Sequence, residues 1–270
     1  MIRNLIENVV VRHKLNKAEK KGNGLLSSLM GDLDEQHPFV KYENALAVKR
    51  DEVSTRLKKV ISEKNPEVFL RLVIFYAAGG YHITKPVDRW IRTAGEACIH
   101  QGYKKLGEKL VRHAEHEAGH ESMHAEDLNL VVDFYNKEFG QNLNAKDLLN
   151  TPFTEGIKNY ISLHEETISG AQPFVQIAIE YEIERLSISA GPVFLKTCFE
   201  RFGLELLRNL KFITEHARLD AGHTIYNRDL ICEFLGKSPS TLDAITLGGQ
   251  KALEYFAQYV EDAYRLAARV

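Results

Sequence analysis

Residues 113–127, with the sequence HAEHEAGHESMHAED, place imidazoles and carboxylates on a helical face that is otherwise apolar. Burying such groups without a partner or a metal ion costs several kcal/mol. The segment therefore predicts a bundle helix whose core-facing side binds a metal ion or builds a buried polar network. In order along the chain, this face carries Leu106, Leu110, His113, Glu117, His120 or Glu121, His124, Leu128, Val131 and Tyr135.

Helical periodicity recurs along the rest of the chain, and no stretch alternates with the two-residue period of a strand. Glycine and proline mark the expected helix ends, so the segment above should belong to one helix that is continuous between Gly102 and Gly140. Other helices are expected to stop at Gly79-Gly80 and before Gly191-Pro192, and a first helix is expected over residues 2–21. The sequence predicts an all-α bundle.

The net charge of −2 and the near-neutral isoelectric point give no sign of a nucleic-acid partner or of an anionic membrane surface. The longest apolar run, residues 72–78, is too short to span a bilayer, and the first residues lack the apolar core of a signal peptide. The three cysteines are widely spaced and odd in number, which is typical of a reducing compartment. We expect a soluble, cytoplasmic protein without a membrane or nucleic-acid partner.

The first candidate for a metal site is the Glu-x-x-His motif formed by Glu117 and His120. Their spacing directs both side chains to one side of a helix, and helical bundles use this spacing to present a carboxylate and an imidazole to one metal ion. His124 lies two turns beyond Glu117 on the same side, so it is an alternate ligand that could replace His120 or bind a second ion.

The second candidate combines His216, Asp220 and His223 in the sequence HARLDAGH. Offsets of four and seven residues place the three side chains within a narrow arc of one helix, in line with an apolar stripe. Two imidazoles and a carboxylate are the ligand type that non-haem iron prefers, and manganese or zinc is also compatible with it.

The third candidate is a glutamate of the helix expected over residues 174–188. Of its three glutamates only Glu182 continues the apolar stripe, so we predict that Glu182 faces the metal, ahead of Glu184 and Glu180. Taken alone, Glu182 would most simply form a buried ion pair with an arginine of a neighbouring helix, such as Arg208. Taken together, about three acids and three histidines are hard to bury without a cation, so the three clusters favour a metal site.

With these motifs on successive long helices, the chain resembles the heme-oxygenase-like diiron oxidases, a group of iron-containing redox enzymes. The stretch EHEAGHESMHAEDL is similar to a segment of that family, with Gly119-His120 and Asp127-Leu128 in register, and HARLDAGH matches its last metal motif. The match covers roughly residues 65–236, and the residues before and after it match only as helices. We therefore expect a single domain over residues 1–270.

The resemblance implies a heme-oxygenase-like bundle in which two Fe(II) ions activate O2. The implied reaction is hydroxylation, desaturation or carbon–carbon cleavage of a small organic substrate, with an electron donor where the reaction needs one. Manganese in place of iron and a homodimer are also compatible with the resemblance. Carried over to this chain, the metal ligands are Glu117, His120, Glu182, His216, Asp220 and His223, with His124 as the alternate to His120.

Two other classes of function remain open from the sequence. The first is a heme-oxygenase-like enzyme that works without a metal, such as a thiaminase-like hydrolase or a cofactorless oxidase. It would need a cysteine nucleophile or histidines that bind substrate, and Cys98 precedes His100 by two residues. The second is a bundle that binds metal without catalysis. Metal content and O2 consumption would separate these alternatives.

Overall fold

The computed structural model describes residues 13–14, 16–17, 19–26, 28–29 and 33–269. The helix expected over residues 2–21 lies for the most part outside this range. The described residues form helices and no strand, so the prediction of an all-α protein is confirmed. The helices are α2 (Pro38–Ile61), α3 (Pro66–Thr84), α4 (Val87–His100), α5 (Lys104–Glu117), α6 (Glu121–Phe139), α7 (Ala145–Leu149), α8 (Glu155–Ser169), η1 (Pro173–Val175), α9 (Gln176–Leu207), α10 (Lys211–Lys237), η2 (Pro239–Thr241) and α11 (Leu242–Ala268).

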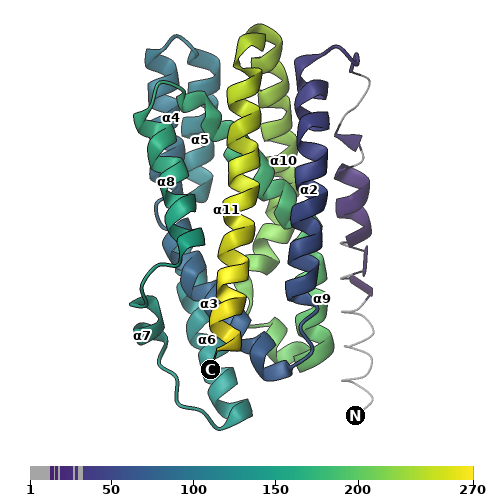
Figure 1. Ribbon diagram of the computed structural model, residues 1–270, viewed down its shortest axis with the longest axis vertical. Coiled ribbons are helices and arrows are strands. Elements are labelled where there is room, and N and C mark those ends of the chain that lie inside the picture. The colour runs from purple at the N-terminus through teal and green to yellow at the C-terminus, as the bar shows by residue number, and fades with distance from the viewer. Residues whose placement is uncertain (1–12, 15, 18, 27, 30–32, 270) are drawn as a thin grey trace.

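The long helices run roughly side by side along the length of the bundle, with α11 in the middle of the view in Figure 1. Helix α11 packs against α2, α3, α8 and α9, while α4 pairs with α5 and α9 pairs with α10. The core between them is closed by fully buried aromatic side chains that include Trp90, Tyr42, Tyr181 and Tyr259. Among the described residues, no helix is both long and apolar enough to cross a membrane.

The prediction of one continuous helix between Gly102 and Gly140 is wrong, because the chain breaks at residues 118–120. Helix α5 ends at Glu117 and α6 begins at Glu121, and the turn between them passes through Gly119 with φ at +86°. This left-handed conformation strains any residue with a Cβ, so glycine is the residue that permits the turn. The break lies inside the histidine-rich segment and decides which of its side chains meet.

Two expected helix ends are also wrong. Helix α3 continues through Gly79-Gly80, and α9 continues through Gly191-Pro192 and has its one non-helical residue at Gly203. At Gly80 a Cβ atom would lie 2.3 Å from Cε1 of His124, so this glycine lets α6 approach α3 rather than ending the helix.

We therefore expect Gly80→Ala to destabilise the fold by about 1–3 kcal/mol, because the methyl group collides with a buried ring. The matched control is Gly222→Ala on α10, where nothing lies within 4 Å of the new Cβ. This control should be neutral or stabilise by up to about 1 kcal/mol, since alanine is the better helix former. Denaturant unfolding of both variants tests the prediction, and equal stabilities would contradict it.

Candidate metal centre

A first set of side chains that could hold a metal ion comes from three helices that are distant in sequence. His113 and Glu117 lie on α5, Glu184 lies on α9 and His223 lies on α10, and one donor atom from each is within 4.8 Å of all the others. His113 Nε2 lies 3.1 Å from Glu184 Oε1 and 3.5 Å from Glu117 Oε1. His223 Nδ1 lies 3.4 Å from the same Glu117 oxygen. The four side chains surround one point in the core.

A second set shares Glu117 with the first and adds His120 and His216, again with donor atoms within 4.8 Å of one another. Glu117 uses its other oxygen here, because Oε2 lies 3.0 Å from His120 Nδ1. The Nδ1 atom of His216 contacts the Phe212 carbonyl oxygen at 2.8 Å, and donation to that oxygen leaves Nε2 as the ligand atom. The predicted ligand Asp220 belongs to neither set; its side chain is buried, and its Oδ1 lies 3.9 Å from His223 Nδ1 of the first set. The two sets therefore lie side by side and share one carboxylate.

The electrostatics of these side chains fit a cation between them. Neither ring nitrogen of His113 makes a hydrogen bond of acceptable geometry with any described residue, nor does His223 Nδ1, although all three atoms are buried. Burial and neighbouring carboxylates raise the pKa of Glu184 and of Asp220. Buried polar groups normally have partners, and buried acids that crowd together are neutralised by protons or by a metal. The donor set of carboxylates and imidazoles is the one that divalent first-row ions use.

The structure does not bring Glu182 to either set, so the prediction that Glu182 faces the metal is wrong. Its fully buried carboxylate accepts hydrogen bonds from Tyr42 Oη at 2.6 Å and from Arg50 Nε and Nη2 at 2.8 and 2.6 Å. The stripe of α9 that carries Glu182 does face the core, but the neighbour at that position is α2. The ion pair that we considered for Glu182 alone is present, with Arg50 as the partner instead of Arg208.

His124 also lies outside both sets, although it was the alternate ligand. Its ring is buried, stacks on Phe212 with centroids 3.6 Å apart and meets Tyr76 edge-on at 5.9 Å. Burial, together with nearby His216, lowers the pKa of His124 to about 3, so the ring is neutral at physiological pH. The break before α6 separates His124 from Glu117.

Sequence reasoning missed two side chains of the first set. Glu184 was ranked behind Glu182, and His113 was placed on the core-facing stripe without being chosen as a ligand. The signal for His113 was present, because it precedes Glu117 by four residues and therefore lies one turn away on the same face.

Two further side chains hold the ligands in place. Asn227 on α10 is fully buried and donates from Nδ2 to Glu184 Oε2 at 2.7 Å, which turns the other oxygen of Glu184 toward His113. Asp127 on α6 accepts the backbone N–H groups of Lys211 and Phe212 at 2.8 and 2.9 Å. This carboxylate caps the first turn of α10 and so fixes the helix that carries His216.

We expect Asn227→Leu to lower the affinity for divalent metal by about 10–100-fold, since partners that orient metal ligands contribute about that much. The control is Thr224→Val, one turn earlier on α10, which is equally buried and whose hydroxyl makes no hydrogen bond among the described residues. Competition with a fluorescent chelator measures both affinities. Equal affinities in the two variants would show that Asn227 does not position Glu184.

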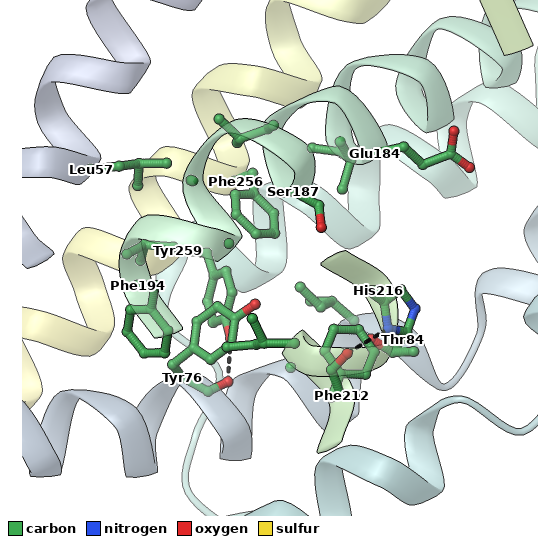
Figure 2. Close-up of a pocket in the computed structure, with 18 of the residues that line it drawn as sticks. Leu57, Tyr76, Thr84, Glu184, Ser187, Phe194, Phe212, His216, Phe256 and Tyr259 are labelled. Atoms are coloured by element: carbon green, nitrogen blue, oxygen red, sulfur yellow. Dashed lines mark hydrogen bonds between the residues drawn. The ribbon is translucent and has the colours of Figure 1, made fainter. Parts of the chain in front are cut away.

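A cavity of about 170 Å³ opens onto the candidate ligands. Glu117, Glu184, His216 and Asp220 contribute to its wall, and most of the remaining wall is aliphatic or aromatic. In Figure 2, Tyr76, Phe194 and Tyr259 lie together on one side of the cavity, while Glu184 and His216 lie on the other. The arrangement places an apolar binding space directly beside a group of metal-binding side chains.

A neutral histidine, His164, contacts Gln176, which in turn donates a hydrogen bond to Glu180 in the cavity wall. His164 is fully buried, its ring stacks on Trp90 with centroids 4.1 Å apart, and its Nδ1 contacts the amide of Gln176. Burial lowers the pKa of His164 to about 3, against a smaller opposing effect of the Gln176 hydrogen bond.

This histidine predicts a loss of stability in acid. The unfolded chain takes up a proton at His164 near pH 6.5, whereas the folded protein does not until the pH approaches about 3. The contribution of His164 is therefore complete above about pH 6.5 and falls by about 1.4 kcal/mol per pH unit below it. In the metal-free protein, the unfolding free energy falls with pH below about 6.5, and we expect His164→Phe to reduce the slope of this fall by up to about 1.4 kcal/mol per pH unit. Denaturant titrations in the acid range test this, and an unchanged slope would contradict it.

No family model and no curated protein matches the sequence. Solved structures match over most of the chain. A domain of unknown function with a heme oxygenase-like fold from Shewanella denitrificans is 19% identical with a TM-score of 0.68, and the match covers 87% of this chain and 94% of that one. The chain has a heme-oxygenase-like fold. The fold expected from the resemblance is thereby confirmed.

Two further structures share this heme-oxygenase-like fold. A TenA homolog from Pseudomonas syringae pv. tomato is 15% identical with a TM-score of 0.64, over 83% of this chain and 91% of its own. A CADD-like protein of unknown function from Nostoc punctiforme is 14% identical with a TM-score of 0.55, over 94% of this chain and 99% of its own. At these identities the likeness establishes the fold, and the function has to be argued from the site.

Proposed function

We propose that this heme-oxygenase-like protein is an O2-dependent oxidoreductase with two divalent metal ions, iron in the first place, that acts on a small organic substrate. The observation that carries the proposal is the pair of donor sets bridged by Glu117 at the wall of an apolar cavity. A purely structural polar network would not need two histidines whose buried nitrogens lie beside crowded acids without a well-formed hydrogen bond.

Different side chains would hold the two ions. His113, Glu184 and His223, with Asp220 beside His223, would hold one ion, and His120 and His216 would hold the other. Glu117 would serve both through its separate oxygens. When bound, reduced iron would supply the electrons with which O2 reacts with a carbon–hydrogen or carbon–carbon bond.

The rest of the chain supplies position and a dry environment. The hydrogen bonds from Asn227 to Glu184 and from His216 to the Phe212 carbonyl fix the orientation of two ligands before any ion arrives. The apolar wall of the cavity holds the substrate against the ligands and keeps water away from them. Hydroxylation, desaturation and carbon–carbon cleavage are all compatible with this arrangement.

The alternative with a cysteine nucleophile finds little support in the geometry. None of the three cysteines lines the cavity. Burial raises the pKa of the Cys98 thiol to about 12 and that of Cys198 still further, so neither forms a thiolate at neutral pH.

The proposal is tested by loading the full-length protein with Fe(II) without oxygen, measuring bound iron, and then following O2 consumption. We expect about two ions per chain and an O2 consumption that depends on them. Bound iron without O2 consumption, also in the presence of a reductant, would favour a metal-binding bundle without catalysis. Turnover that persists after the metal is removed would favour a metal-independent enzyme.

A further inference from the structure

Besides Asp220, one further acid in the cavity wall belongs to neither of the two sets of candidate ligands. Glu180 lies on α9 one turn before Glu184 and therefore on the same face of the helix. It is nine-tenths buried, with an exposed fraction of 9%, and it lines the cavity. Its role is not explained by the proposed metal centre.

The hydrogen-bond partner of Glu180 among the described residues is neutral, and the one cationic group that acts on Glu180, His113, is already paired with Glu117 and Glu184. Gln176 Nε2 donates to Glu180 Oε1 at 2.5 Å, and the same amide group contacts His164. All residues that line the cavity lie in the described part of the chain, and none of them is a lysine or an arginine. In keeping with this, burial raises the pKa of Glu180 to about 8, despite the opposing effect of His113.

Aromatic rings also line the cavity. Tyr160 and Phe256 meet at a centroid distance of 6.2 Å, and burial together with the nearby Glu180 carboxylate raises the pKa of Tyr160. Aromatic faces attract cations, and an acid beside them completes a surface that is complementary to an ammonium group. A carboxylate or phosphate would instead meet another acid without any cation in the wall.

We propose that the cavity binds a small, mostly hydrocarbon amine, with Glu180 as the counter-ion of its ammonium group. The inference rests on the proposed function only in taking this cavity as the substrate site. Binding an ammonium group would give the buried carboxylate a counter-charge of its own, whereas His113 is shared with Glu117 and Glu184.

The test compares probes that share a hydrocarbon chain and differ in the head group. Hexylamine, hexanol and hexanoate are titrated into the metal-free, full-length protein by calorimetry. We expect hexylamine to bind about 10-fold tighter than hexanol, as a hydrogen-bonded charge pair implies, and hexanoate to bind most weakly. Hexanol binding as tightly as hexylamine, or hexanoate binding most tightly, would overturn the inference without any variant.

Variants then identify the acid that carries the preference. Glu180→Gln keeps the shape and the contact with Gln176, and it should lower hexylamine affinity about 10-fold while leaving hexanol affinity nearly unchanged. Glu184→Gln, one turn further on the same helix, is the matched control and should retain the amine preference. An equal loss in both variants would mean that the amine binds the metal-ligand acids, which would contradict the role of Glu180.

The two proposals can fail separately. Amine binding is measured without metal and without oxygen, so it can be present in a protein that never consumes O2. Conversely, a protein that binds iron and consumes O2 but shows no preference for hexylamine would retain the proposed function and lose the inference about Glu180.

Discussion

Glu117→Gln should remove both metal ions, which is the largest effect that the structure predicts for a single substitution. Glu117 is the one side chain common to both donor sets, with one oxygen facing each. Loss of a residue that only orients a ligand lowers metal affinity by about 10–100-fold, so loss of the shared carboxylate should exceed about 100-fold. Elemental analysis after loading with Fe(II) and removal of free metal measures this directly.

The control for Glu117→Gln is Glu115→Gln, on the same helix but with an exposed side chain. It should retain full metal content. If Glu117→Gln retained one ion while losing the other, the carboxylate would belong to a single site, and the bridged arrangement would be wrong.

Glu182→Gln should have the opposite phenotype, with metal content retained and stability lost. The carboxylate of Glu182 is fully buried and paired with Arg50, whose side chain also pairs with Glu43 at 2.9 Å. Removing one partner of a buried ion pair costs about 3–5 kcal/mol, and here it leaves Arg50 and Arg185 to share the single carboxylate of Glu43. For a chain of this size that corresponds to a fall in Tm of about 6–20 °C, measurable by calorimetry.

A double variant shows whether the stability loss comes from the Arg50 charge that has lost Glu182 as its partner. Combining Glu182→Leu with Arg50→Met should recover much of the stability, since Glu43 keeps its ion pair with Arg185 at 3.0 Å and its hydrogen bond from Tyr181. Glu184→Gln provides the comparison for metal content, and we expect it to lose iron while Glu182→Gln does not. If Glu182→Gln lost iron and kept its stability, our assignment of the two glutamates would be reversed.

The parts of the site that follow from local spacing could be predicted from the sequence. The pair Glu117 and His120 and the pair His216 and His223 are each set by offsets within one helix or one turn, and the structure places all four side chains in the two sets that share Glu117. The all-α fold followed from helical periodicity for the same reason. The spacing of residues along a helix therefore predicts which side chains of that helix lie on the same face.

The choice between Glu182 and Glu184 could not be made from the sequence, because both side chains are buried. An apolar stripe identifies the face of α9 that enters the core, but it does not say which helix lies opposite. Here Arg50 of α2 faces one glutamate and His113 of α5 faces the other. Long-range packing decides between them.

The glycines were misread for a similar reason. Gly80 was taken as a helix end because glycine favours turns, whereas its function is a close approach between α3 and His124. Gly119 was taken as part of a continuous helix, whereas it adopts a left-handed conformation and ends α5. A glycine in a sequence shows only that a side chain is absent. The tertiary structure shows whether a positive φ angle or close packing is the reason for the glycine.

The central claim is that two bridged metal sites lie at the wall of the cavity. The most direct test is anomalous diffraction at the iron edge from crystals of the full-length protein loaded with Fe(II) without oxygen. We expect about two peaks per chain, one among His113, Glu184 and His223 and one between His120 and His216, with Glu117 between the peaks. Absence of anomalous density at these side chains under saturating iron, or a peak elsewhere in the bundle, would contradict the account.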